Sequence, residues 1–327
     1  MRRKRMGGEG MSRREFLQRA AGWGSLAFLS QRAKGANERL GIALIGAGGR
    51  GQALMQEIRD HAQATNAAVV AICDVWRLNR EAAVARARDW FGLEPRSSSD
   101  YQEVLTWPEV DAVVIATPDF SHPRILVDAV RAGKDAYCEK PLANTLEEAK
   151  EALRAVKETG RIVQIGTQRR SDGYHKAAAE VVRSGVLGKI SRIVMSFNFN
   201  EPRWRRDVGN VREEDVDWKR FLMHLPPRPF DPKQFRLWHF YRDFTTGMPG
   251  LWMSHFIDLV PWFTGDPFPR SAVAHGGVYV WQDGREHADT FHALLEYPQG
   301  LLVSWSMGLG NSAGNVFTLH GTNGTLD

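Results

Sequence analysis

A glycine-rich turn followed by an acid is the first group of residues in this chain whose types and spacing could do chemistry. Residues 46–51 read Gly-Ala-Gly-Gly-Arg-Gly, and Asp74 ends the next apolar run. Such a turn lets backbone N–H groups approach a pyrophosphate, and an acid at the end of a second strand can accept hydrogen bonds from both ribose hydroxyls of an adenosine. The pattern predicts a dinucleotide site.

The segments around this turn predict the elements that must hold it. An apolar run at 42–45 leads into the turn, and an amphipathic segment follows at once, which gives the order strand, turn, helix. Gly46 permits the tight turn, Gly48 lets the backbone reach the phosphates, and Gly51 lets the helix pack closely against the strand. The positive end of the helix dipole then favours the phosphate charge.

The residues at the end of the second apolar run bear on the choice between NAD and NADP. Asp74 favours NAD because its carboxylate suits free ribose hydroxyls. Arg77 and Arg80 follow closely, where a 2′-phosphate would lie, so the sequence leaves NADP open.

A further loop carries polar residues at a strand end. Residues 117–122 read Thr-Pro-Asp-Phe-Ser-His and follow an apolar strand, at the carboxyl end where α/β folds place ligands. His122 can contact cofactor or substrate there, or it can cap the helix expected at 122–132, and both interpretations remain open.

Residues 139–141 read Glu-Lys-Pro at the end of another expected strand. Because proline disfavours helical geometry in the residue before it, Lys140 is held at the strand end. With the glycine turn, Asp74 and the loop 117–122, this motif makes the chain resemble the glucose–fructose oxidoreductase/inositol dehydrogenase/rhizopine catabolism family, Gfo/Idh/MocA, over about residues 39–200. The resemblance implies a Rossmann domain followed by an α/β domain with an open, mostly antiparallel sheet. It also implies that Lys140 contacts both the nicotinamide and a substrate hydroxyl.

The order of the remaining segments fits two domains after a leader. Alternating strands and helices predict a doubly wound parallel sheet in the first domain, and successive strands predict one broad sheet in the second, whose uncovered face is a plausible subunit interface. The expected boundaries are 1–36 for the leader, 37–166 for the Rossmann domain and 167–327 for the second domain. In the second domain a helix is expected at 174–184, and strands at 190–200, 271–281, 288–297, 301–307 and 316–320. Residues 321–327 look like a turn entering a further strand, so truncation and a short variant both remain open.

The resemblance also implies a histidine on a helix of the second domain, four residues after an aspartate. His255 matches the histidine, but Leu251 stands where the aspartate is expected. An imidazole with its ordinary pKa near 6.5 can accept an alcohol proton at neutral pH, although a buried structural histidine is the alternative interpretation. Asp258 is expected to be structural, and His239 or Tyr241 can compensate for the missing acid.

Other side chains have weaker claims to the site. Trp204 is one of several tryptophans in the second domain, and aromatic faces suit the C–H edges of sugars, although most tryptophans are core residues. The arginines around it, 203, 205 and 206, can bind a carboxylate or form a solvated loop. Cys73 and Cys138 are expected to be small buried residues, and no metal site is expected.

The positive charge of the chain lies in its first residues. The formal net charge is +5, but residues 1–36 hold nine Lys/Arg and two Asp/Glu, so a nucleic-acid partner is not expected. Basic residues, Ser12-Arg13-Arg14-Glu15-Phe16-Leu17 and an apolar stretch resemble a twin-arginine export signal. This predicts use of the twin-arginine translocase and a periplasmic location, with cleavage after Gly35 or an uncleaved membrane tether both open.

The expected reaction moves a hydride between a sugar or polyol carbon and C4 of NAD or NADP. Lys140 would hydrogen-bond the reacting oxygen, and His255 would take or return the proton. Two alternatives are an NAD-dependent glycoside-cleaving enzyme that uses transient oxidation and elimination, and a non-catalytic sensor of cofactor or ligand. The expected cofactor contacts are Gly46, Ala47, Gly48, Gly49, Arg50, Gly51, Asp74, Arg77, Thr117, Pro118, His122, Glu139 and Lys140. The expected substrate contacts are Lys140, Trp204, His239, Tyr241 and His255.

Overall fold

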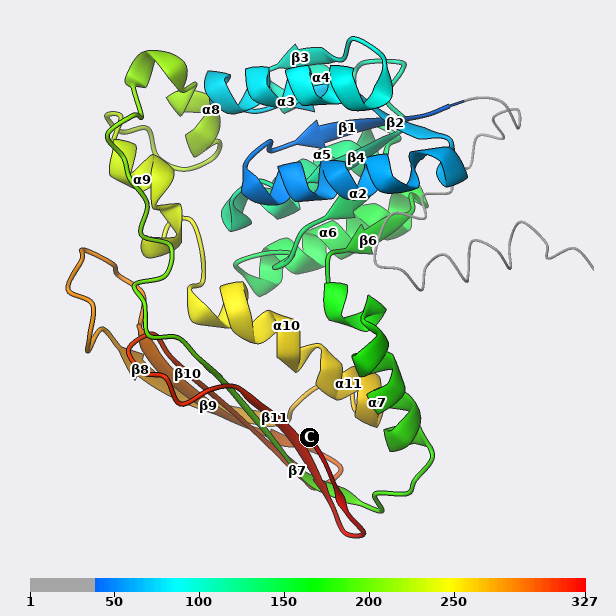
Figure 1. Cartoon of the computed structure of the whole chain (residues 1–327), viewed down its shortest axis with the longest axis vertical. Coiled ribbons are helices and arrows are strands. Elements are labelled where there is room, and N and C mark those ends of the chain that lie inside the picture. Colours follow the sequence, from blue (N-terminus) through cyan, green and yellow to red (C-terminus); the bar gives the residue numbers. More distant parts are fainter. Residues whose placement is uncertain (1–38) are drawn as a thin grey trace, which may run out of the picture.

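Two sheets and the helices that pack on them make up the computed structural model, which describes residues 39–327 (Figure 1). The leader and its export motif lie outside the described residues. The first sheet holds six parallel strands in the order β3-β2-β1-β4-β5-β6, which confirms the predicted doubly wound sheet. Its strands are β1 (Leu40–Ile45), β2 (Ala67–Cys73), β3 (Arg96–Ser98), β4 (Ala112–Ile115), β5 (Asp135–Cys138) and β6 (Val163–Ile165).

Helices cover both faces of this sheet, which explains why its central strands are apolar throughout. One face packs against α2 (Gly49–Thr65) and α3 (Arg77–Phe91). The other packs against α4 (Tyr101–Leu105), α5 (His122–Arg131) and α6 (Leu146–Thr159). Because the strands are parallel, the carboxyl ends of β1, β2, β4 and β5 meet at one edge, and the loops named above follow these ends.

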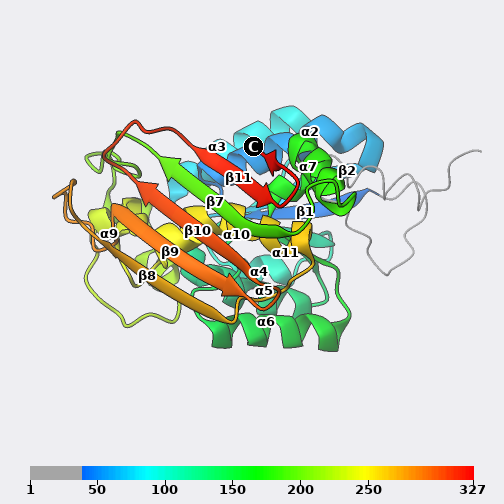
Figure 2. The same ribbon diagram turned by 90° about the horizontal axis from the view of Figure 1, so that it is seen from below.

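The second sheet is open and mostly antiparallel, as predicted. Its order is β12-β11-β7-β10-β9-β8, and only the pair of β7 and β10 is parallel. One face packs on α7 (Gly173–Arg183), α10 (Ser254–Ile257) and α11 (Leu259–Thr264), whereas no described element covers the other (Figure 2). The strands are β7 (Ile190–Asn198), β8 (Ser271–Gly277), β9 (Thr290–Tyr297), β10 (Leu301–Gly308), β11 (Val316–Gly321) and β12 (Thr325–Leu326).

A segment between β7 and α10 leaves the second sheet and crosses to the first. We call residues 199–248 the covering segment; it contains α8 (Trp218–Leu222), α9 (Pro232–Arg236) and two 3-10 turns, Glu213–Asp215 and Trp238–Phe240. Its backbone forms hydrogen bonds with the first unit, by which we mean the first sheet and its helices. The Asp217 N–H donates to the Val75 carbonyl at 2.8 Å, and the Phe120 N–H donates to the Phe244 carbonyl at 3.1 Å. The segment therefore closes over the carboxyl edge of the first sheet, an arrangement that the sequence did not predict.

Local differences from the predicted elements are small and have local causes. The strand expected at 271–281 ends at Gly277. The helix expected at 174–184 spans Gly173–Arg183, and Asp172 caps it because its carboxylate accepts from the Tyr174 N–H at 2.9 Å. Within residues 39–327 we find no helix that is both long and apolar enough to cross a membrane.

Candidate cofactor and substrate site

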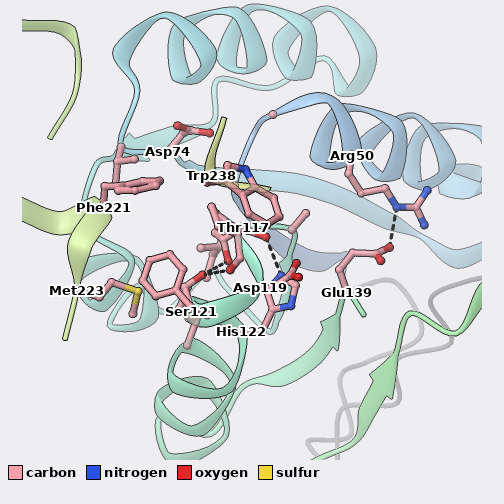
Figure 3. Close-up of a pocket in the computed structure, with 18 of the residues that line it drawn as sticks. Arg50, Asp74, Thr117, Asp119, Ser121, His122, Glu139, Phe221, Met223 and Trp238 are labelled. Atoms are coloured by element: carbon pink, nitrogen blue, oxygen red, sulfur yellow. Dashed lines mark hydrogen bonds and ion pairs between the residues drawn. The ribbon is translucent and has the colours of Figure 1, made fainter. Parts of the chain in front are cut away.

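A cavity of about 850 Å³ lies between the carboxyl edge of the first sheet and the covering segment (Figure 3). Most of the residues singled out in the sequence line it together. They are Gly46, Gly48, Gly49, Arg50, Asp74, Thr117, Pro118, His122, Glu139, Lys140, Trp204, His239 and His255. Four do not reach it, namely Ala47, Gly51, Arg77 and Tyr241.

The glycine turn has the geometry that a bound pyrophosphate needs. Gly46 has φ +91°, and a Cβ at Gly51 would lie 1.9 Å from the Gly46 carbonyl oxygen, so neither position accepts a side chain. Gly48 is the N-cap of α2, without a side-chain cap, and a Cβ at Gly49 would meet nothing within 4 Å. The first turn of α2 itself carries no acidic residue, so the unsatisfied N–H groups at the start of this helix suit an anionic phosphate.

Asp74 is held by the same turn that it follows. Its carboxylate accepts from the backbone N–H groups of Ala47 and Trp76, both at 2.7 Å, and burial raises its pKa. Ala47 is thus a residue that positions the acid, and Gly51 is a residue that permits close packing. Neither residue lines the cavity, so their direct contact with the cofactor stays a prediction.

The arginines expected near a 2′-phosphate are used elsewhere. Arg77 hydrogen-bonds Asp215 of the covering segment and Glu81 of its own helix, and it is not among the residues that line the cavity. The Arg80 guanidinium donates to the Asp74 carbonyl at 2.7 Å. Both arginines thus have partners within the protein, and the contact of Arg77 with the cofactor stays a prediction that these contacts do not support.

His122 is buried and holds the loop in which it lies. Its Nδ1 lies 2.8 Å from the Pro141 carbonyl oxygen and its Nε2 lies 2.7 Å from that of Thr117. The ring thereby ties the ends of β4 and β5 together, at the first residue of α5. Both ring nitrogens are occupied, which favours the structural interpretation over a direct role in chemistry.

Glu139 links the motif at 139–141 to the glycine turn. Its Oε1 accepts from Arg50 Nε at 2.7 Å, and its Oε2 accepts from the Lys140 N–H at 3.1 Å (Figure 3). Arg50 also donates to the Gln168 side chain at 2.8 Å. Glu139 therefore fixes the end of β5 and the arginine of the turn.

Lys140 reaches from the first unit to the second. Its Nζ donates to the Leu251 carbonyl at 2.8 Å, and the Lys140–Pro141 peptide bond is cis. Burial lowers the pKa of Lys140, while the charges of Asp119 and Glu139 oppose that shift. Asp119 is itself buried and accepts from the Thr245 hydroxyl at 2.7 Å. The lysine therefore keeps an acidic neighbour although position 251 supplies none.

His255 follows a short π-helix, Pro249–Met253, of a kind that is frequent at functional sites. Its Nδ1 is buried and has no hydrogen-bond partner among the described residues. Burial, followed by the charge of Lys140, lowers its pKa to about 3, so the ring is neutral at ordinary pH. Asp258 pairs with Arg170 at 2.7 Å, as expected of a structural residue.

His239 stacks with two tryptophan rings. The ring of Trp204 is parallel to it within 8° at a centroid distance of 5.6 Å, and that of Trp238 lies at 3.6 Å. Trp204 has φ +65°, an unusual backbone conformation for an aromatic residue. Burial lowers the pKa of His239 well below its ordinary value, and the charges of Arg206 and Lys140 add to that shift. Tyr241 instead packs against Phe244 outside the cavity.

Several lining residues were not singled out in the sequence. Asp119 lies within the quoted loop 117–122, and its position at a strand end was the available signal. Phe221, Met223 and Trp238 come from the covering segment (Figure 3). Nothing local distinguishes these three from core residues, because their place depends on the segment crossing between the two sheets.

Comparisons with known proteins agree with this architecture. Residues 40–167 match the family described as "Oxidoreductase family, NAD-binding Rossmann fold", and residues 175–327 match the "GFO/IDH/MocA C-terminal domain". The inositol 2-dehydrogenase of Pseudarthrobacter chlorophenolicus is 33% identical over 267 residues, which cover 81% of this chain and 66% of that protein. The scyllo-inositol 2-dehydrogenase (NAD(+)) of Bacillus subtilis is 43% identical over 98 residues, 30% of this chain and 28% of that protein.

Other comparisons define how far the likeness extends. The matches to three curated relatives, among them the scyllo-inositol 2-dehydrogenase, cover only 28–43% of the length of each relative. A solved structure of the WlbA dehydrogenase from Chromobacterium violaceum, in complex with NADH and UDP-GlcNAcA, superposes with a TM-score of 0.71. It is 19% identical, and the match covers 89% of this chain and 74% of that one. That likeness is one of fold.

Proposed function

The chain belongs to the Gfo/Idh/MocA oxidoreductase family, and we propose that it transfers a hydride between a hydroxyl-bearing carbon of a sugar or polyol and C4 of NAD. One observation carries the proposal. The ammonium of Lys140 and the neutral rings of His239 and His255 line the same cavity as an uncapped glycine turn. Alcohol oxidation by a nicotinamide releases one hydride and one proton, so a hydrogen-bond donor to the reacting oxygen, a proton acceptor and a phosphate site in one cavity suit this reaction.

The glycine turn, Asp74 and Lys140 would hold the dinucleotide. The N–H groups at the start of α2 would bind the pyrophosphate, and Asp74 would accept from the adenosine ribose. When bound, NAD supplies the hydride acceptor. NAD is favoured over NADP because the carboxylate of Asp74 would repel a 2′-phosphate and Arg77 is paired with Asp215 outside the cavity.

Lys140 and His255 would handle the proton of the substrate hydroxyl. The Lys140 ammonium would donate to the reacting oxygen, which stabilises the negative charge that develops as the proton leaves. His255 Nδ1 is unpaired and neutral, so it can accept that proton. The parallel rings of Trp204, His239 and Trp238 offer an apolar wall for the C–H edge of a sugar.

The test is reduction of NAD by the purified full-length chain. A panel of polyols and sugars is added with NAD, and absorbance at the reduced-nicotinamide band is followed; the same panel is then run with the His255→Asn variant. Reduction that needs both a sugar or polyol and the intact residue supports the proposal. Cleavage of glycosides without net reduction would instead support the redox-neutral alternative, and absence of any nucleotide binding would refute both.

We also propose that the chain is exported and self-associates. The motif Ser12-Arg13-Arg14-Glu15-Phe16-Leu17 supports transport by the twin-arginine translocase to the periplasm, and a change of both arginines to lysine should block export in a fractionation assay. The uncovered face of the second sheet supports a homo-oligomer. Val273 and Leu294 are cross-strand partners on that face, and their side chains are 65% and 44% exposed.

A further inference from the structure

Two arginines of the covering segment line the cavity without an acid opposite them. Within residues 39–327, neither Arg206 nor Arg236 makes an ion pair with an aspartate or a glutamate. Neighbouring arginines of the same segment do: Arg203 pairs with Glu201 at 2.8 Å, and Arg205 pairs with Asp283 at 3.2 Å. Arg203 and Arg220 of this segment also line the cavity, and Arg220 pairs with Asp217. The lack of an acidic partner therefore distinguishes Arg206 and Arg236 from the other cavity-lining arginines of the segment.

The two arginines line the same cavity, Arg206 as an exposed residue and Arg236 as a half-buried one. Besides desolvation, the charge of Arg236 lowers the pKa of Arg206. Arg236 lies over the Trp76 ring at 5.1 Å, and its Nε is buried without a hydrogen-bond partner among the described residues. An anion in the cavity near both guanidinium groups would be attracted by two positive charges.

The two arginines have neighbours at both ends of the cavity, Trp76 for Arg236 and His239 for Arg206. Trp76 donates its backbone N–H to Asp74, at the end expected to hold the adenosine. Arg206 acts electrostatically on His239, at the end that holds Lys140. A guanidinium binds phosphate and carboxylate groups through paired N–H donors, and the Nε of Arg236 is one donor that lacks an acceptor.

We propose that Arg206 and Arg236 together bind an acidic group, a phosphate or a carboxylate, of a molecule held in this cavity. Two sources share this chemistry: the pyrophosphate of the dinucleotide and an acidic group on the sugar substrate. The proposal rests on the proposed function because it assumes that this cavity holds the dinucleotide and the sugar substrate. It concerns binding and not catalysis, so it can be tested without measuring turnover.

The experiment measures binding by calorimetry to the full-length chain and to Arg206→Gln, Arg236→Gln and the double variant. Arg205→Gln is the matched control, because it removes the same charge from the same loop at a residue that does not line the cavity. One pair of probes, ADP-ribose and adenosine, tests the cofactor as the source. A second set, glucuronate and glucose 6-phosphate against glucose, tests the substrate with NAD present. Circular dichroism checks that each variant is folded.

Each arginine is expected to contribute about tenfold in affinity for the acidic probe, and the double variant up to about a hundredfold, with the neutral probe unchanged. A selective loss for ADP-ribose assigns the acidic group to the cofactor, and a selective loss for the acidic sugars assigns it to the substrate. The proposal is overturned if no acidic probe loses more affinity than its neutral counterpart, or if Arg205→Gln causes the same loss. Failure of NAD reduction alone would refute the proposed function and leave this binding result standing.

Discussion

Replacing Lys140 by methionine should remove most of the turnover through one lost interaction. Methionine keeps much of the length of the side chain but removes the ammonium that would donate to the reacting oxygen. Loss of a donor to a developing oxyanion costs about 2.7–4 kcal/mol, which is a fall of about 10²–10³ in kcat. The contact between Lys140 Nζ and the Leu251 carbonyl, at 2.8 Å, is lost at the same time.

The substitution also has a structural effect that must be separated from the chemical one. Asp119 is only 3% exposed; burial raises the pKa of its carboxyl, and the charges of His122 and Lys140 oppose that shift. Removal of that charge leaves a less well compensated buried carboxylate, which costs about 1–3 kcal/mol in unfolding free energy. The double variant Asp119→Asn/Lys140→Met removes the acid as well and should recover much of that loss.

The assay combines unfolding in urea with NAD reduction on the substrate found in the polyol and sugar panel. The single variant should be less stable and nearly inactive, and the double variant should be more stable than the single one and equally inactive. Lys140→Arg keeps the charge and should retain part of the activity. Turnover by Lys140→Met within about threefold of the parent would refute the role given to the ammonium.

Three further expectations concern pH, cofactor choice and assembly. The pKa of His255 is about 3 in the folded chain, below the ordinary value of 6.5, so the unfolded chain binds more protons between these two pH values. The free energy of unfolding should therefore fall as pH falls through that range, by at most about 1.4 kcal/mol per pH unit. His255→Gln should flatten this pH dependence in urea unfolding, and an unchanged slope would contradict the lowered pKa. In calorimetry, Arg77→Ala should keep the ratio of affinities for NAD and NADP within about twofold of the parent value, whereas Asp74→Ala should shift that ratio toward NADP. A larger shift with Arg77→Ala would show that this arginine reaches the cofactor. Val273→Lys/Leu294→Lys should lower the mass of any oligomer in light scattering while NAD binding is kept; an unchanged mass would place the interface elsewhere.

The first unit could be predicted closely from the sequence because its signals are local. Gly46 needs a positive φ, Gly51 meets the turn backbone, and the apolar run ending at Asp74 forms a strand, all of which depend on short-range geometry. Thr145 and Glu148 form a capping box at the start of α6, again as their spacing predicts.

The contacts that cross between units could not be predicted in the same way. Arg77 looked available to a phosphate because Asp215, its partner, lies far along the chain in the covering segment. The partner of Arg77 is set by the path of residues 199–248, which no local pattern encodes. Tyr241, expected to compensate for the missing acid, instead packs against Phe244 within the same segment.

Leu251 changes how the proton would be shared between Lys140 and His255. A carboxylate at 251 would pair with the lysine or raise the pKa of the imidazole. In the structure Lys140 Nζ instead donates to the Leu251 carbonyl, and His255 Nδ1 has no hydrogen-bond partner among the described residues. A ring with a pKa of about 3 is a weak base, so most of the stabilisation of the reacting oxygen should come from the ammonium. We therefore expect His255→Asn to lower kcat by about 10–10², less than Lys140→Met does. The opposite order in matched kinetics would show that the imidazole, despite the missing acid, is the principal proton acceptor and that its pKa rises when the cavity is filled.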